Sequence, residues 1–154
     1  MDEIQTLVRA LGGRDVKAGY AALKRLLDES GRSDAVAPHL PDFAALLRGG
    51  NSYQRTRGAL LLCANARWDD AGVVDGALGD LLALAVDPKP VAARQCIGAL
   101  PGLAAAKPAL AARIRAALEA ANPEARYPDS MAPLVRRDID AALAEIGNTP
   151  EENV

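Results

Sequence analysis

Three arginines stand at matching places in apolar stretches of the chain. Arg57, Arg94 and Arg136 are each followed three residues later by an aliphatic side chain. Residues three apart share one face of a helix, so the pattern predicts helices whose apolar side packs inward. A guanidinium presents a planar fork of donors that fits a carboxylate or a phosphate. In stacked helices the series would form either an anion-binding ridge or a structural ladder, each arginine pairing with an acidic turn residue such as Asp69 or Asp87.

Further candidate contact residues surround the first of these arginines. Tyr53 lies one turn before Arg57 and is placed to stack on it or to display its hydroxyl. Arg55 points to another helix face, because residues two apart diverge on a helix, and is a candidate surface contact. Trp68 is expected either to fill the junction of two helices or to serve as an exposed recognition aromatic. The candidate binding set is Tyr53, Arg55, Arg57, Trp68, Arg94 and Arg136.

The sequence contains no constellation typical of catalysis or metal binding. Cys63 and Cys96 lie in apolar helical stretches, and a free cysteine in that setting acts as a small buried hydrophobe. His39 is the only histidine, and Asp138 and Asp140 lie two apart on a helix, so their carboxylates cannot converge. We expect no catalytic residues, no bound metal and no cofactor, although the question of enzymatic activity stays open.

Composition limits the fold that must position these side chains. The 154 residues include 33 Ala and 21 Leu against 9 Val and 5 Ile, with 3% aromatic residues, which favours helices over strands. The net charge of −2 disfavours nucleic acid and anionic membranes as partners. Apolar runs such as 81–86 are too short to span a bilayer, and the acidic start resembles no secretory leader. We expect an all-α cytoplasmic protein without a membrane segment.

Apolar periodicity and helix-stop residues divide the chain into helices joined by short loops. A single domain over residues 1–147 is expected, followed by a disordered polar tail over 148–154. The expected helices cover residues 2–11, 15–29, 41–48, 51–65, 70–86, 90–100, 108–121 and 129–146, with Val16, Tyr20, Leu23 and Leu27 on one face of the second.

The arginine helices resemble the second helix of HEAT-type repeats, in which a Val-Arg-like pair follows an Asp-Pro turn. Ala93-Arg94 after Asp87-Pro88 is the best match, Val135-Arg136 is fair, and Thr56-Arg57 is weaker. The resemblance implies a short right-handed α-solenoid of about three HEAT-like helix pairs over residues 34–147, with the first two helices as an N-terminal cap.

The chain also resembles a small bacterial family of single-domain HEAT-like proteins, some of them labelled SufBD-like for Suf-type iron–sulfur assembly. This resemblance rests on residues 55–58, 66–69, 93–97, 127 and 129–131.

These resemblances imply a function in binding rather than in catalysis. An extended inner surface of stacked helices suits the capture of a segment of another protein, by a monomer or a weak homodimer. One alternative is a nucleic-acid-binding protein similar to the HEAT-like alkylpurine DNA glycosylases, for which Trp68 and Asp69 are the attractive residues. Another alternative is an accessory to iron–sulfur cluster assembly, which rests on the family label alone.

Overall fold

The protein is all-helical in the part of the chain that the structure, a computed structural model, describes. Residues 2–147 are described, so the expected disordered segment 148–154 lies outside the described residues. Within 2–147 there are nine α-helices, three short 3-10 turns and no strand. The all-α prediction from composition is therefore confirmed.

The helices are α1 Glu3–Leu11, α2 Val16–Ser30, α3 Leu40–Leu46, α4 Ser52–Ala64, α5 Val73–Leu84, α6 Pro90–Ala106, α7 Ala111–Ala120, α8 Pro123–Arg126 and α9 Ala132–Ile146. Asp and Asn side chains cap the N-termini of several of these helices. Asp2, Asp15 and Asn51 each accept a hydrogen bond from the backbone N–H three residues on, at the starts of α1, α2 and α4.

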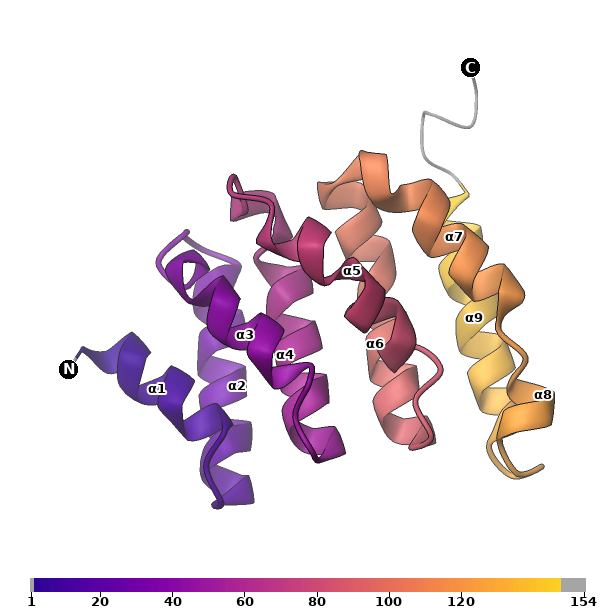
Figure 1. Ribbon diagram of the computed structural model, residues 1–154, viewed down its shortest axis with the longest axis horizontal. Coiled ribbons are helices and arrows are strands. Elements are labelled where there is room, and N and C mark those ends of the chain that lie inside the picture. Colours follow the sequence, from indigo (N-terminus) through magenta and orange to yellow (C-terminus); the bar gives the residue numbers. More distant parts are fainter. Residues whose placement is uncertain (1, 148–154) are drawn as a thin grey trace.

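The helices form two layers. In Figure 1, α1, α3, α5 and α7 lie in front, and α2, α4, α6 and α9 stand side by side behind them. Each front helix leads into a rear helix, so the rear helices run parallel and begin at the same, lower edge of the view. Packing joins α2 to α4, α4 to α6, and α6 to α9 within the rear layer.

One continuous apolar core lies between the layers, from Leu11 in α1 to Ile146 in α9. Alanine and glycine let the helices approach closely. A methyl group at Gly58 of α4 would lie 2.5 Å from the carbonyl oxygen of Phe43 in α3, closer than real contacts allow. Small residues at this crossing therefore fix the separation of α3 and α4.

Helix α6 is longer than predicted. We expected its end at Pro101-Gly102, yet it continues to Ala106 with Pro101 inside it. Proline removes one N–H from the helix and is costly there, about 3 kcal/mol. Leu103 and Ala104 beyond it are fully buried, and their burial favours continuing the helix.

Two other local predictions are corrected. The segment before the last helix contains a further single turn, α8, begun by Asn122, whose side chain accepts from the N–H of Ala125. The last helix begins at Ala132 rather than at Asp129 or Ser130, and Pro133 occupies its first turn. A proline in the first turn of a helix is well tolerated because that N–H lacks a helical partner.

The lengths and polarity of the helices decide whether any of them can cross a membrane. Among residues 2–147, no helix combines the length and the apolar character that crossing a bilayer requires.

Candidate functional site

A groove of about 590 Å³ crosses the rear layer over α2, α4 and α6. It gathers every large hydrophobic side chain that the described part of the chain leaves exposed. These are Val16 (50% exposed), Tyr20 (59%), Tyr53 (60%) and Val91 (61%). A contiguous exposed apolar surface of this kind is typical of a binding site rather than of ordinary protein surface.

Helix α2 carries two apolar stripes, and one of them, formed by Val16, Tyr20 and Leu23, lines the groove. The stripe that packs into the core is Gly19, Ala22, Leu23, Leu26 and Ser30. Val16 and Tyr20, which the periodicity places on one face with Leu23 and Leu27, are exposed and lie outside the core stripe. Leu23 lies at the boundary, because it is buried and also lines the groove.

Arg57 forms part of the groove lining and is almost entirely buried, with 5% exposed. Its guanidinium donates to the carbonyl oxygens of Leu11 at 2.9 Å and Val16 at 3.1 Å, across the turn between α1 and α2. Gly19 makes room for it, since a methyl group there would come within 2.3 Å of a guanidinium nitrogen. The side chain thus holds the first helix pair against α4.

Cations also orient the two tyrosines. The Arg57 guanidinium carbon lies 5.9 Å from the ring centre of Tyr53, and the Lys24 ammonium lies 5.5 Å from that of Tyr20. Contacts of this length are favourable because the face of an aromatic ring is negative. Of the two placements expected for Tyr53, the structure shows the ring against Arg57, with 60% of the residue exposed.

A second hollow of about 410 Å³ lies between α6 and α9. It adjoins the first, since Val91 and Gln95 line both. Arg94 lies here, with its Nε donating to Asp138 of α9 at 2.6 Å, and Glu145 lines the same hollow. The hydrogen bond to Asp138 raises the pKa of the Arg94 guanidinium. The second hollow therefore carries carboxylates, which the first lacks.

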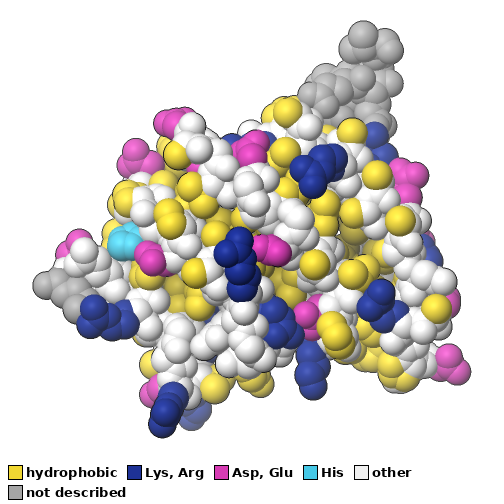
Figure 2. Space-filling view, in the orientation of Figure 1, with side chains coloured by type: hydrophobic (Ala, Val, Ile, Leu, Met, Phe, Trp, Pro, Cys, Tyr) yellow, Lys and Arg dark blue, Asp and Glu magenta, His cyan; other side chains and the backbone are white. Residues whose placement is uncertain are grey.

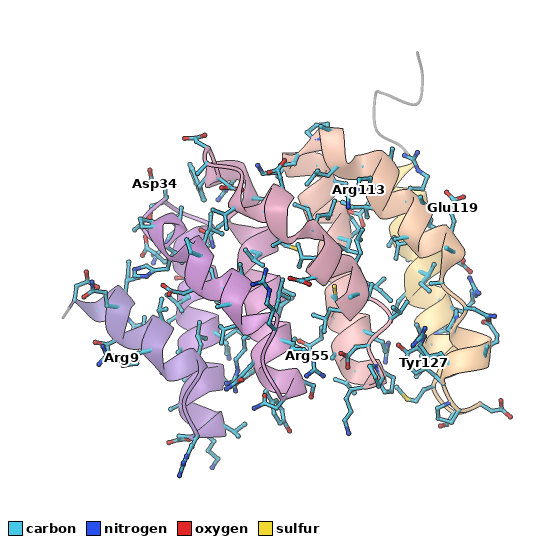
Figure 3. All side chains as sticks on the ribbon, viewed as in Figure 1. Arg9, Asp34, Arg55, Arg113, Glu119 and Tyr127 are labelled. Carbon is cyan, nitrogen blue, oxygen red and sulfur yellow. The ribbon has the colours of Figure 1, made fainter. Side chains whose placement is uncertain are left out.

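Arg55 lies away from the groove, on the side of α4 that faces α6 (Figure 3). Its guanidinium pairs with Asp87 in the turn before α6, with N–O distances of 3.1–3.3 Å, and donates to the carbonyl of Gly49. Asp87 is 6% exposed, and its carbonyl accepts from the Tyr127 hydroxyl at 2.5 Å. Arg55 thus joins two helix pairs instead of standing free at the surface.

The three repeated arginines do not share one role. Arg57 binds main-chain carbonyls of the preceding helix pair, and Arg94 binds Asp138 of the following rear helix. Arg136 binds Glu124 of α8 at 2.7 and 3.1 Å, which holds the pKa of that carboxyl below its usual value. The acidic partners proposed from the sequence, Asp69 and Asp87, pair with none of the three.

Trp68 lies at the other end of α2 and is partly buried. Its indole N–H and the guanidinium of Arg67 both donate to the carbonyl of Ser30, the last residue of α2, at 3.0 Å. The guanidinium carbon of Arg67 lies 4.6 Å from the centre of the Trp68 ring. Trp68 thus caps a helix end, where a carbonyl lacks its helical partner.

Asp69 is likewise engaged in structure. Its carboxylate accepts the N–H groups of Val73 at 3.0 Å and Val74 at 2.8 Å, at the start of α5, and pairs with Lys107. Burial alone would raise the pKa of Asp69, but the two backbone donors and the Lys107 ammonium outweigh it and hold the pKa below its usual value. Both residues singled out for the glycosylase-like alternative thus hold helix ends.

The two cysteines are buried in the core, as expected. Burial raises the pKa of Cys63 to about 12 and that of Cys96 well above its usual value. A thiol without thiolate character reacts slowly, so we expect the folded protein to react with a disulfide reagent at least about a hundredfold more slowly than the unfolded chain at mildly alkaline pH. Absorbance of the released thiolate measures both rates. Rapid reaction of either thiol in the folded state would contradict the burial.

Metal ligands do not gather in the described region. Among residues 2–147, no group of three or more histidine, cysteine or acidic side chains is placed to hold a metal ion.

The face formed by the front layer contrasts with the groove. Figure 2 shows positive and negative side chains scattered over that face, with no large patch of one sign. The groove on the rear layer, with its apolar and aromatic lining, is therefore the better candidate site.

No protein-family model matches this chain, and neither a curated protein nor a solved structure does. The function must therefore be argued from the groove itself.

Sequence reasoning found only part of this site. It named Tyr53 and Arg57 in the groove and Arg94 in the neighbouring hollow, and it missed Val16, Tyr20, Lys89 and Val91. One signal was available for α2. Small residues at Gly19 and Ala22, beside Leu23 and Leu26, form a second stripe that suits close helix packing better than a tyrosine does.

Proposed function

We propose that this chain is a non-enzymatic, cytoplasmic interaction module that holds a segment of another protein in the groove over α2, α4 and α6. The architecture we propose for it is the short right-handed HEAT-like solenoid that the arginine helices resemble. Two layers of helices in chain order, with the rear helices parallel, support this architecture. Stacked helix pairs expose a continuous rear surface on which an extended or helical segment can lie.

The observation that carries the proposal is the concentration of exposed apolar side chains in one place. Val16, Tyr20, Tyr53 and Val91 come from three helices and line a single groove. Tyrosine dominates the energetics of protein interfaces because a large ring is buried at a small entropic cost. The groove lining contains no histidine, cysteine or carboxylate, the side chains that most often act as bases and nucleophiles.

We test the proposal with random dodecapeptides displayed on phage and selected on the immobilised protein. Selected peptides are then synthesised, and their affinities are measured by fluorescence anisotropy. The double variant Tyr20→Ser, Tyr53→Ser is expected to weaken binding by at least about tenfold, because each tyrosine is an interface anchor. Both side chains are more than half exposed, so the melting temperature should hardly change.

Arg113→Ser is the matched surface control, since Arg113 is exposed on α7 of the front layer. The Arg113→Ser variant should bind the selected peptides with the same affinity as the unmodified protein. Failure to enrich any peptide, or equal binding by the tyrosine double variant, would overturn the proposal.

A further inference from the structure

The charge of Arg57 has no anionic partner within the described chain. Arg55, Arg94 and Arg136 each pair with a carboxylate, whereas the Arg57 guanidinium donates to two carbonyls at the α1–α2 turn and lies against the ring of Tyr53. With 5% of the residue exposed, little water compensates this cation. A buried charge is costly unless an opposite charge or a set of hydrogen bonds offsets it, and carbonyl dipoles offset it only in part.

The start of α6 adds to the positive potential of the groove. Val16, Ser52 and Pro90 are the first residues of α2, α4 and α6, and all three line the groove. Asp15 and Asn51 cap the starts of α2 and α4, whereas no side chain caps α6, so its start keeps the partial positive charge of a helix N-terminus. Lys89, exposed and without an ion pair in residues 2–147, adds a full charge at the same end. No carboxylate occurs in the lining.

From these observations we infer that the segment held in the groove carries an acidic side chain, flanked by apolar residues. Its carboxylate lies over Arg57 and Lys89 at the helix starts, and the apolar residues beside it pack between Tyr20, Tyr53 and Val91. This inference rests on the proposed function, and it names the chemistry of the partner.

The same features favour a peptide over a nucleic acid. A phosphodiester strand needs a row of cations along its path, whereas Arg57 and Lys89 are the only cations of the lining and the rest of it is uncharged. Beyond Val91 the surface continues into the second hollow, where Arg94 neutralises Asp138 and the Glu145 carboxylate disfavours a continuing phosphate backbone. A peptide with one acidic residue can place that residue beside Arg57 and Lys89 and keep it away from Glu145 in the second hollow.

The test uses Lys89→Glu, because Arg57 also holds the first helix pair and its loss would disturb the fold. Lys89 is exposed and directly precedes α6, where an acidic side chain is favourable to the helix. Peptides selected on the unmodified protein are synthesised in two forms, one with the acidic residue and one with the matching amide. Fluorescence anisotropy then gives the affinity of each form.

We expect the amide form to bind the unmodified protein at least about tenfold more weakly than the acidic form, as for loss of a charge-assisted contact. Lys89→Glu should weaken the acidic form by a similar factor and leave the amide form nearly unchanged. Arg113→Glu makes the same change of charge in the first turn of α7, outside the groove, and should leave both forms unaffected.

The outcomes separate the inference from the proposed function. Peptides that bind through the tyrosines but carry no acidic residue, or whose acidic and amide forms bind equally, would overturn the inference and leave the proposed function standing. Failure to select any peptide would overturn both. Binding of a deoxythymidine oligonucleotide that is tighter than that of every peptide, and is lost in Lys89→Glu, would overturn the inference in favour of single-stranded nucleic acid.

Discussion

Replacing Gly58 by alanine is expected to destabilise the protein by about 2–3 kcal/mol, although alanine is the better helix former. The added methyl group would lie 2.5 Å from the carbonyl oxygen of Phe43 and 2.9 Å from the β-carbon of Leu46. The first contact is with main chain, so relief requires α3 to move away from α4. The movement would open the core around Phe43, which is fully buried.

Urea denaturation followed by circular dichroism measures this loss, and the melting temperature should fall by about 5–10 °C for a chain of this size. Gly79→Ala is the matched control, since Gly79 lies inside α5 with nothing within 4 Å of the added methyl group. It should gain about 0.5–1 kcal/mol from helix propensity. Equal effects of the two substitutions would show that the α3–α4 crossing is not tightly packed.

Arg55→Met is expected to cost about 3 kcal/mol, toward the lower end of the range for breaking a buried ion pair. The methionine retains most of the side-chain volume and removes the charge, which leaves the Asp87 carboxylate buried with only the N–H of Lys89 as a partner, at 2.9 Å. The effect stays near the lower end because the Arg55 side chain is 22% exposed. Urea denaturation at neutral pH measures the loss.

Arg94→Met serves as the comparison, because its pair with Asp138 is far more open to water, with 39% and 25% of the two side chains exposed. Ion pairs at the surface contribute little to stability, so the urea midpoint should move much less than for Arg55→Met. A larger shift for Arg94→Met would contradict the greater contribution assigned to the buried pair of Arg55 with Asp87.

Much of the fold follows from local sequence signals. Alanine and leucine content predicts helices, and the helix-stop residues Gly12-Gly13, Gly49-Gly50 and Asp87-Pro88 begin one to three residues after the ends of α1, α3 and α5. These signals act within a few residues, so a single sequence suffices to read them. The extension of α6 through Pro101 could not be read in this way, because burial by distant helices offsets the local cost of proline.

The partners of the arginines also depend on tertiary structure. Two residues of α4 that are two positions apart bind different neighbouring helix pairs. Arg57 binds the carbonyl of Leu11 in the preceding pair, and Arg55 binds Asp87 in the turn before α6. The apolar periodicity of the sequence predicts this helix, but it does not predict which other helices pack against it. On α2, two apolar stripes lie side by side, and the sequence alone did not show which of them packs into the core.

The contacts of Asp87 affect how the helices of the molecule open when the fold is destabilised. Its carboxylate accepts from Arg55 of α4 and from the N–H of Lys89, which directly precedes α6, and its carbonyl accepts from Tyr127 ahead of α9. Three successive helix pairs therefore converge on one turn, and a fluctuation that detaches any of them weakens the anchorage of the other two. From this shared anchorage we expect the central and C-terminal helices to open cooperatively. The α1 end lacks this tie and is the natural place for fraying to begin.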